Sequence, residues 1–204
     1  MNTYLLEIGL EEMPAQVILP AVEQLKSMAE KTCEKYQLNF NDLKIYSSPR
    51  RLAILLSGLP DKENDRKVDL KGPPLTVAKD EYNNWTKAAE GFANKNNITL
   101  KNLETKTIEG RDYLFLQHLE LGQPVPKLLQ ESALKWISQI NFPKNMRWGS
   151  YSTRYVRPIR WIVSLWNNKV LPIKLEMLVA GNQTRGHRFL SSGYSKIKHA
   201  SDYE

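Results

Sequence analysis

Apolar and polar positions follow two different periods along this chain. The segments 3–9, 43–48 and 51–59 are dominated by apolar and β-branched residues and are short, which predicts three strands. Over residues 15–37 the apolar positions recur at steps of three, four or seven, which is the spacing of one helix face. We therefore predict a long amphipathic helix whose apolar side carries Ile18, Val22, Leu25, Ala29 and Tyr36.

The second half of the chain shows the same two periods. Helices are predicted over 82–96, with Trp85, Ala88, Ala89 and Phe92 on one face, and over 124–140, with Val125, Leu128, Leu129, Ala133, Trp136, Ile137 and Ile140 in one stripe. Residues 103–121 have the pattern of a hairpin that turns at Glu109-Gly110. A second hairpin is predicted from 159–166 and 169–178, because Asn167-Asn168 suits a tight turn. Residues 179–193 contain glycines and have the pattern of a loop.

These elements predict an α+β fold with mainly antiparallel sheets and amphipathic helices. The charged stretch 61–74, which ends in Gly-Pro-Pro, has the composition of a linker. We expect residues 1–60 and 142–204 to form one strand-rich core unit. Residues 75–140 would then form an inserted helix–hairpin–helix lobe.

The positive charge is concentrated in one region. The formal net charge is +7, yet residues 142–199 hold 11 basic residues and a single acid, Glu176, which is a net of +10 for that region. Such asymmetry favours a polyanion or an acidic partner, although a solvated face is the plain alternative. The one cysteine, Cys33, excludes an internal disulfide and suits a reducing compartment, and no apolar run is long enough for a membrane span. We expect a cytoplasmic protein with no membrane partner.

Basic residues cluster in four short motifs, and aromatic residues lie among them. Arginine pairs or forks grip phosphates, and aromatic rings stack on unpaired bases, so the mixture is typical of RNA-binding surfaces. Trp161 and Trp166 are expected in the core instead. The motifs are "SSPRR" (47–51), "FPKNMRWG" (142–149), "RYVRPIRW" (154–161) and "GNQTRGHRF" (181–189), and the candidate RNA-binding residues are Arg50, Arg51, Lys144, Arg147, Arg154, Arg157, Arg160, Arg185, His187 and Arg188.

Motifs for catalysis are missing from the sequence. It contains no GxxxxGK phosphate loop, no GxGxxG and no GxSxG elbow, and its three histidines lack cysteine partners at metal-ligand spacing. Glu11 and Glu12 are adjacent, so they point in different directions and suit a helix N-terminus better than an acid/base pair. We predict no catalytic residue, no metal site and no bound cofactor in this chain.

Seven motifs in order nevertheless resemble one family. Together they are similar to the N-terminal part of the beta subunit of bacterial glycyl-tRNA synthetase, the type with two alpha and two beta chains. The resemblance runs from about residue 5 to the end, and "KIKHASDYE" (196–204) has the pattern of the middle of a domain, so we expect a piece of a longer subunit. The motifs are "LLEIGLEEMPA" (5–15), "SPRRLAILLSGL" (48–59), "KGPP" (71–74), "AAEGFA" (88–93), "FPKNMRWG" (142–149), "RYVRPIRWIVSLW" (154–166) and "GNQTRGHRFL" (181–190).

The resemblance implies that the alpha and beta subunits have different functions. In the family, the alpha subunit carries the class II core that binds ATP and glycine, and the beta subunit chiefly binds tRNA and is required for activity. The partners implied are the alpha subunit, glycine tRNA and the rest of the beta subunit. Two functions stay open for the basic region: contact with tRNA, or docking on another subunit, because arginine and aromatic residues are also enriched in protein interfaces. A third, hydrolytic editing in the loop 182–188, is disfavoured because a small pocket for glycine excludes larger amino acids by size.

Overall fold

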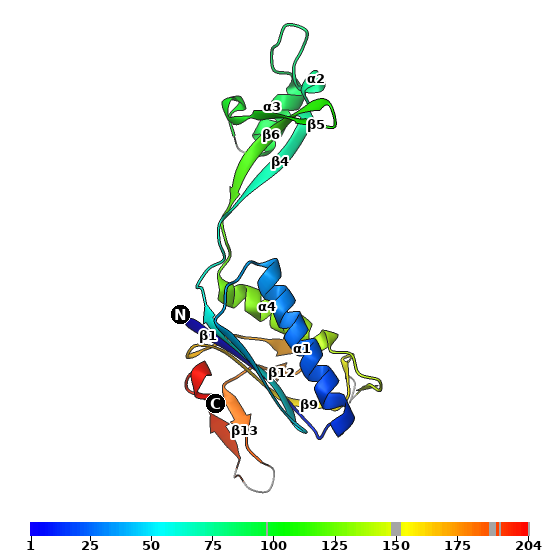
Figure 1. Cartoon of the computed structure of the whole chain (residues 1–204), viewed down its shortest axis with the longest axis vertical. Coiled ribbons are helices and arrows are strands. Elements are labelled where there is room, and N and C mark those ends of the chain that lie inside the picture. Colours follow the sequence, from blue (N-terminus) through cyan, green and yellow to red (C-terminus); the bar gives the residue numbers. More distant parts are fainter. Residues whose placement is uncertain (97, 148–151, 188–190, 192, 204) are drawn as a thin grey trace. The chain divides into compact units, whose positions relative to one another are not determined.

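The computed structural model describes residues 1–96, 98–147, 152–187, 191 and 193–203. Its contacts divide the chain into two compact units (Figure 1). The first unit contains residues Met1–Glu63 and Gln123–Glu204, and the second contains Asn64–Gly122. The chain leaves and re-enters the first unit at neighbouring points, because the amide of Glu63 donates to the carbonyl of Gln123 at 3.0 Å.

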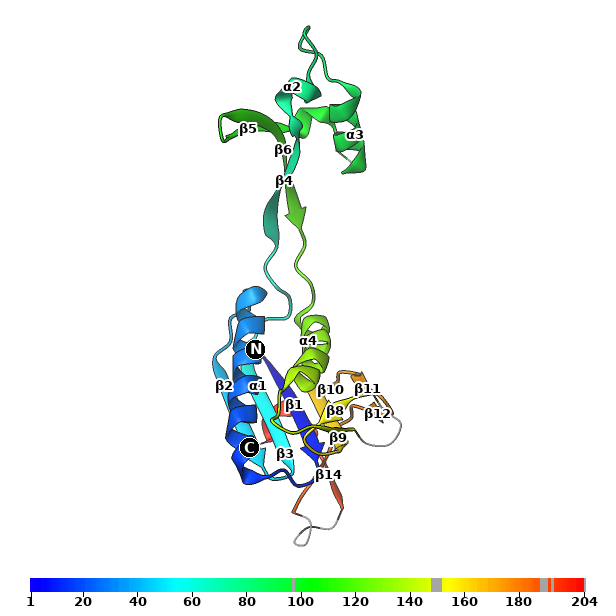
Figure 2. The same cartoon turned by 90° about the vertical axis from the view of Figure 1, so that its right-hand side faces the viewer.

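The first unit is built on an antiparallel sheet, here called the main sheet. Its strands are β1 (Asn2–Leu10), β2 (Asp42–Ser48), β3 (Arg51–Leu59), β9 (Ile159–Trp166) and β10 (Lys169–Val170), and they lie in the order β10-β9-β1-β3-β2 (Figure 2). Strand β1 is central, so β3 and β9 both begin beside its carboxyl end. Gly9 pairs with Arg51 on one side and with Trp161 on the other.

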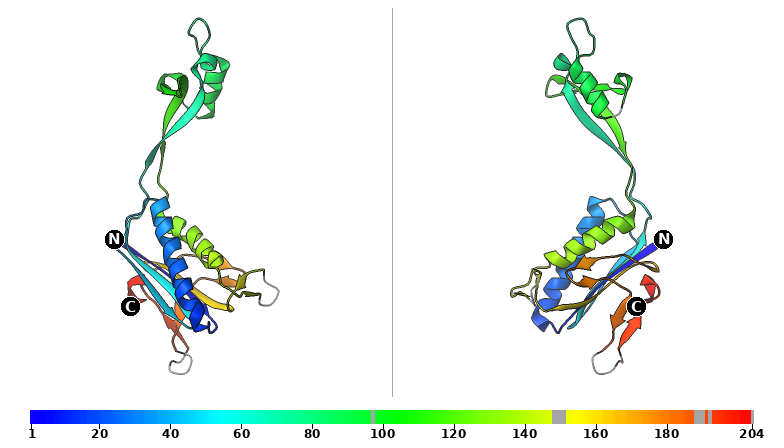
Figure 3. Two further views of the ribbon diagram at one scale, coloured as in Figure 1. Left: turned by 45° about the vertical axis from the view of Figure 1, so that its right-hand side comes forward. Right: turned by 180° about the vertical axis from the view of Figure 1, so that it is seen from behind.

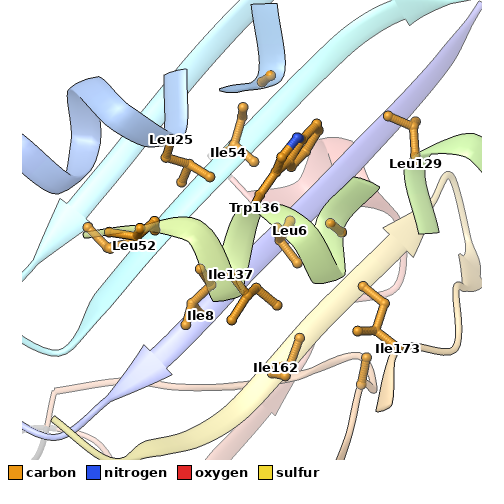
Figure 4. Packing of buried hydrophobic residues seen from close by; sticks show 14 of the residues in the cluster. Leu6, Ile8, Leu25, Leu52, Ile54, Leu129, Trp136, Ile137, Ile162 and Ile173 are labelled. Atoms are coloured by element: carbon orange, nitrogen blue, oxygen red, sulfur yellow. The ribbon is translucent and has the colours of Figure 1, made fainter. Parts of the chain in front are cut away.

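Two helices cover one face of the main sheet. They are α1 (Ala15–Lys35), which begins directly after Pro14, and α4 (Val125–Gln139). Alternate residues of β1 point to this face, because side chains along a strand alternate between its two sides. Leu6 and Ile8 lie there in one apolar cluster with Leu25 of α1 and with Trp136 and Ile137 of α4 (Figure 4). The helices therefore shield a largely apolar layer, in which the hydroxyls of Tyr4 and Ser164 lie 3.3 Å apart.

The opposite face of the main sheet is covered by the C-terminal elements. These are β13 (Gln183–Arg185), β14 (Tyr194–Lys196) and the 3-10 helix η2 (Ala200–Tyr203). The apolar cluster on this face is smaller and includes Leu5, Trp161 and Ala200. Short strand pairs complete the unit: β7 (Met146–Arg147) with β8 (Arg154–Tyr155), and β11 (Lys174–Leu175) with β12 (Leu178–Val179).

The second unit is a smaller α+β module. Strands β4 (Arg66–Pro74), β6 (Arg111–Glu120) and β5 (Glu104–Ile108) form an antiparallel sheet in that order, joined by α2 (Leu75–Ala78), α3 (Lys87–Lys95) and the 3-10 helix η1 (Leu100–Asn102) (Figure 3). Its fully buried cluster, among the described residues, consists of Ala78, Ala89 and Leu114. The turn between β5 and β6 uses positive φ at Glu109 and Gly110.

Several sequence predictions are confirmed. They are the α+β class, the strands β1, β2, β3 and β9, the hairpin around Glu109-Gly110, and the helices α1 and α4. Trp161 and Trp166 are buried, as expected. The linker prediction for 61–74 was wrong from Arg66 onward, because β4 pairs with β6 there. Its charged residues alternate with Val68 and Leu70, so the strand is only half buried and has a weak apolar signal.

Other boundaries also differ from the predictions. Helix α4 lies in the first unit, although the sequence placed it in the inserted lobe 75–140. Helix α3 begins at Lys87 instead of residue 82, and Tyr82 is highly exposed in the turn before it. The predicted strand 169–178 is interrupted, since Pro172 cannot donate to a ladder and Glu176 has a positive φ of 54°. The predicted loop 179–193 contains β13.

Candidate RNA-binding site

Backbone hydrogen bonds join three segments at the carboxyl end of β1. Leu10 donates to the carbonyl of Arg50 at 2.8 Å, and Glu11 donates to the carbonyl of Pro158 at 3.0 Å. The β2–β3 turn and the start of β9 are thereby held against the residues that follow β1. We call the resulting surface the basic edge, and it comprises Arg50, Arg51, Arg157, Arg160, Arg185 and His187.

Arg157 and Arg160 reach across to the segment after β1. The Nε of Arg157 donates to the carbonyl oxygen of Glu12 at 3.0 Å. Arg160 forms an ion pair with Glu11, with 3.2 Å between Nε and Oε1. Both side chains of that pair are well exposed, so the pair adds little stability and mainly fixes where the guanidinium lies. The carboxylate of Glu11 thus contacts Arg160, whereas Glu12 contacts Arg157 through its backbone. Neither residue lies in the first turn of α1, where the predicted role at a helix N-terminus would place it.

A buried carboxylate organises the side of the basic edge under β13 and η2. Glu7 is completely buried and accepts hydrogen bonds from Trp161 Nε1, from Thr184 Oγ1 at 2.6 Å and from the hydroxyl of Tyr203. It also pairs with Arg51, with 3.6 Å between Oε2 and Nη1. Burial, and then the nearby Glu7 charge, raise the pKa of Tyr203 well above its usual range. The tyrosine therefore stays protonated and acts as a donor to Glu7.

Arg185 completes the edge from β13. Its guanidinium lies 4.2 Å from the ring centre of Tyr194 and 5.8 Å from that of Trp161, which are cation–π distances. Arg50 approaches the same Trp161 ring at 6.0 Å. The carbonyl of Arg185 accepts a hydrogen bond from Arg51. Two arginines that are far apart in the sequence, Arg50 and Arg185, therefore meet over one tryptophan.

Two pockets open along the basic edge. We call the first, of about 240 Å³, the arginine pocket; among the described residues it is lined by Glu11, Arg50, Arg185, Gly186, His187, Ser191 and Gly193. The second, of about 440 Å³, is lined in that same part of the chain by Glu12, Ser48, Pro49, Arg50, Arg51, Gly186 and His187. Gly186 allows this packing, because a Cβ at its position would lie 2.2 Å from the Oγ of Ser191.

The remaining predicted residues lie apart from the two pockets. Arg147 and Arg154 face each other across the β7–β8 pair and are exposed, as is Lys144. Like charges directly opposite on two strands repel each other, and within the described ranges neither arginine has an ion-pair partner. Arg188 lies outside the described residues. The structure thus brings together six of the predicted residues at the basic edge and places three on or before β7–β8.

Sequence reasoning missed Glu7, Tyr194 and Tyr203, and it included Thr184 only as a polar member of the motif 181–189. One signal was visible: Glu7 is a charged residue inside the apolar strand "TYLLEIG". Strand alternation puts it on the same face as Leu5, away from the helix-covered core. A charge at that position needs buried partners. Those partners come from segments far from Glu7 along the chain, so the sequence does not identify them.

Within the part of the chain that the structure describes, no group of three or more His, Cys, Asp or Glu side chains is arranged to hold a metal ion. None of the described helices combines the length and the apolar character that a bilayer crossing requires. Burial raises the pKa of Cys33 to about 11, so its thiol is a poor nucleophile at neutral pH.

Comparison with known proteins gives a consistent result. The family model described as "Glycyl-tRNA synthetase beta subunit" matches residues 4–204. The chain is 44% identical to the glycine–tRNA ligase beta subunit of Picosynechococcus sp. over 100% of its length, and 43% identical over 99% to that of Limosilactobacillus fermentum. The corresponding protein of Lactiplantibacillus plantarum is 43% identical over 100% of the chain. In each case the chain covers 29% of the relative's own length.

Proposed function

Because the chain belongs to the glycyl-tRNA synthetase beta subunit family, we propose that it is part of a glycine–tRNA ligase and that its basic edge contacts glycine tRNA. The alpha subunit would perform the ATP-dependent attachment of glycine. This chain would hold the tRNA and would work in the cytoplasm, where tRNA is charged. It would bind no cofactor itself.

One observation carries the proposal: the fold gathers arginines from separate segments at the carboxyl end of β1. Arg50 lies in the β2–β3 turn and Arg51 begins β3. Arg157 precedes β9, Arg160 lies in β9, and Arg185 lies in β13. Arginine binds phosphate with a planar fork of donors, and contacts to the phosphate backbone supply most of the affinity of proteins for nucleic acids. The opposed Arg147 and Arg154 would extend this surface, since a phosphate between them would relieve their repulsion.

The test is tRNA binding by the full-length beta subunit, assembled with the alpha subunit, over a series of salt concentrations. We expect the logarithm of the affinity to fall linearly with the logarithm of salt. The Arg154→Ala/Arg157→Ala double variant should bind more weakly, with a slope reduced by roughly 0.7–0.9 for each phosphate that the protein no longer neutralises. A matched control is Lys127→Ala/Lys135→Ala, which removes the same charge from positions of α4.

Equal losses of affinity in the two double variants would show that only net charge matters and would contradict the proposed site. Binding that does not respond to salt would contradict phosphate contacts altogether.

A second candidate function is docking of a partner subunit beside β8. Glu176, in the β11–β12 turn, accepts hydrogen bonds from the hydroxyls of Ser152 and Thr153 at 2.9 and 2.8 Å. This contact brings the neighbouring Met177, which is 76% exposed, close to the start of β8. A mixed apolar and basic surface suits a protein interface. Under this function, Met177→Ser would weaken assembly with the alpha subunit, measured by sedimentation, and would leave tRNA affinity unchanged in the assembled fraction.

A further inference from the structure

We propose that the arginine pocket is a binding site for a terminal phosphate group, a phosphate monoester at the end of an RNA chain or on a free nucleotide. The RNA source rests on the proposed function, whereas the phosphate site itself does not. The pocket is small and polar, and it lies within a single compact unit.

The first step is to identify the arginines of the basic edge whose positive charge has no neighbouring carboxylate. At the basic edge, Arg51 is neutralised by Glu7 and Arg160 by Glu11. Arg50 and Arg185 both line the pocket, and neither has a carboxylate partner among the described residues. The Nε of Arg50 is moreover buried without a hydrogen-bond acceptor. Buried donors are normally satisfied, so the protein leaves the hydrogen-bonding capacity of the Arg50 guanidinium incomplete.

The second step is that the two guanidiniums are held in place. Both stand over the ring of Trp161, and Arg185 also stacks on Tyr194 at 4.2 Å. The ring of Trp161 is itself fixed by its hydrogen bond to Glu7. Two like charges beside one ring repel each other, and stacking on the rings offsets only part of that cost. A doubly charged anion would neutralise both.

The third step is the choice of anion. A phosphate monoester carries about −1.5 to −2 charges at pH 7, which matches the two arginines, whereas each phosphate within a nucleic-acid backbone carries one. The pocket volume of about 240 Å³ is far above the minimum of about 10–15 Å³ that one water needs, so it leaves room for a phosphate group with some hydration. Glu11 also lines the pocket, but its ion pair with Arg160 reduces its repulsion of an anion.

The experiment compares glycine tRNA that carries a 5′-phosphate with the same tRNA ending in a 5′-hydroxyl. Binding to the assembled full-length ligase is measured at one fixed salt concentration. We expect the phosphorylated form to bind about tenfold more tightly, in line with charge-assisted hydrogen bonds. Arg50→Ala and Arg185→Ala should each remove most of this preference, and Arg50→Lys should restore only part of it, because lysine keeps the charge and loses the fork.

Two controls separate this inference from the proposed function. Arg147→Ala should weaken binding of both tRNA forms by the same factor and leave their ratio unchanged. Adenosine 5′-monophosphate, compared with adenosine, tests a free nucleotide as the source, with Arg50→Ala as its control. Each arginine variant must have the same denaturation midpoint as the unaltered protein. The test of the phosphate site then uses whichever of Arg50→Ala and Arg185→Ala meets this condition.

The outcomes are distinct. A 5′-phosphate preference that depends on Arg50 or Arg185 supports the site with an RNA end as ligand. A phosphate-dependent nucleotide affinity without a tRNA preference supports it with a free nucleotide. If neither preference exists while tRNA still binds in a salt-dependent manner, the pocket is no phosphate site and the proposed function stands. If tRNA fails to bind while the nucleotide binds, the proposed function falls and the phosphate site remains.

Discussion

The two faces of the main sheet are made by the same strands and yet have different chemistry. Tyr4, Leu6 and Ile8 of β1 point toward α1 and α4 and lie in a cluster of apolar neighbours. Leu5 and Glu7 point to the opposite face, where a buried carboxylate lies among aromatic rings and arginines. The helix-covered face holds the fold together by burial, whereas the Glu7 face fixes the position of charged groups.

This difference has an energetic reason. Burying a large apolar side chain stabilises the fold by about 1.5–3 kcal/mol and needs no partner of defined geometry. A buried carboxylate loses its hydration, and its hydrogen bonds and ion pair must compensate for that loss. Three donors and Arg51 around Glu7 do so, and they also hold Trp161 under the arginines.

The largest effect is expected on the helix-covered face. Trp136 is buried at 2% exposure, and its Nε1 donates to Thr32 Oγ1 at 3.0 Å. Replacing it with alanine should lower the free energy of unfolding by about 3–5 kcal/mol, because a large cavity is left under α4. Chemical denaturation measures this loss. The matched control is Leu19→Ala, since Leu19 of α1 is 71% exposed, and its change should stay within about 0.5 kcal/mol.

Glu7→Ala should lower the free energy of unfolding somewhat less than Trp136→Ala. It should disturb the structure of the Glu7 face more. Removing the carboxylate leaves Arg51 without its partner. Loss of one member of a fully buried pair costs about 3–5 kcal/mol, and because the Arg51 side chain is 25% exposed we expect a loss at the lower end of that range. Hydrogen exchange should then increase in β13, β14 and η2, with little change in α1. Glu7→Gln keeps an acceptor and should cost less. Uniform exchange throughout the first unit would show that Glu7 supports the whole core and not one face.

A smaller effect is expected from Gly9→Ala, which acts on the geometry of the Glu7 face without removing a charge. A Cβ at Gly9 would lie 1.9 Å from Cε2 of Trp161, so the ring must move. Such overpacking costs about 1–3 kcal/mol. The displaced ring would carry Arg50 and Arg185 away from their positions, so the 5′-phosphate preference should fall although every arginine is still present.

Gly110→Ala is the matched control for backbone strain, because Gly110 has a positive φ of 76° and no neighbour within 4 Å of a built Cβ. It should lower stability and leave the 5′-phosphate preference unchanged. If both glycine variants keep the preference, the position of Trp161 does not control the arginines.

Sequence patterns predicted the helix-covered face better than the Glu7 face, and the reason is periodicity. The apolar stripe of α4 indicates that the helix is buried, and Leu128 and Trp136 are. The stripe does not indicate which element the helix packs against, so the sequence prediction placed α4 in the wrong unit. Candidate arginines were found because each lies in a basic motif. Their meeting over Trp161 depends on long-range strand pairing, which no local pattern records.

The smallest effect concerns Glu176, a carboxylate that, unlike Glu7, is only partly buried. Its pKa is lowered first by the hydrogen bond from the Thr153 hydroxyl and then by those from Ser152 and the Thr153 amide. A lowered pKa means that the contribution to stability is present above the ordinary glutamate pKa and is lost as the pH falls through the lowered value. An NMR titration should show this low pKa, and Thr153→Val should move it back toward the ordinary value. Because Glu176 is only partly buried, water can replace the missing donor, so the variant should unfold at nearly the same denaturant concentration as the unaltered protein. A loss of stability as large as that of Glu7→Ala would show that burial is not what separates the two carboxylates.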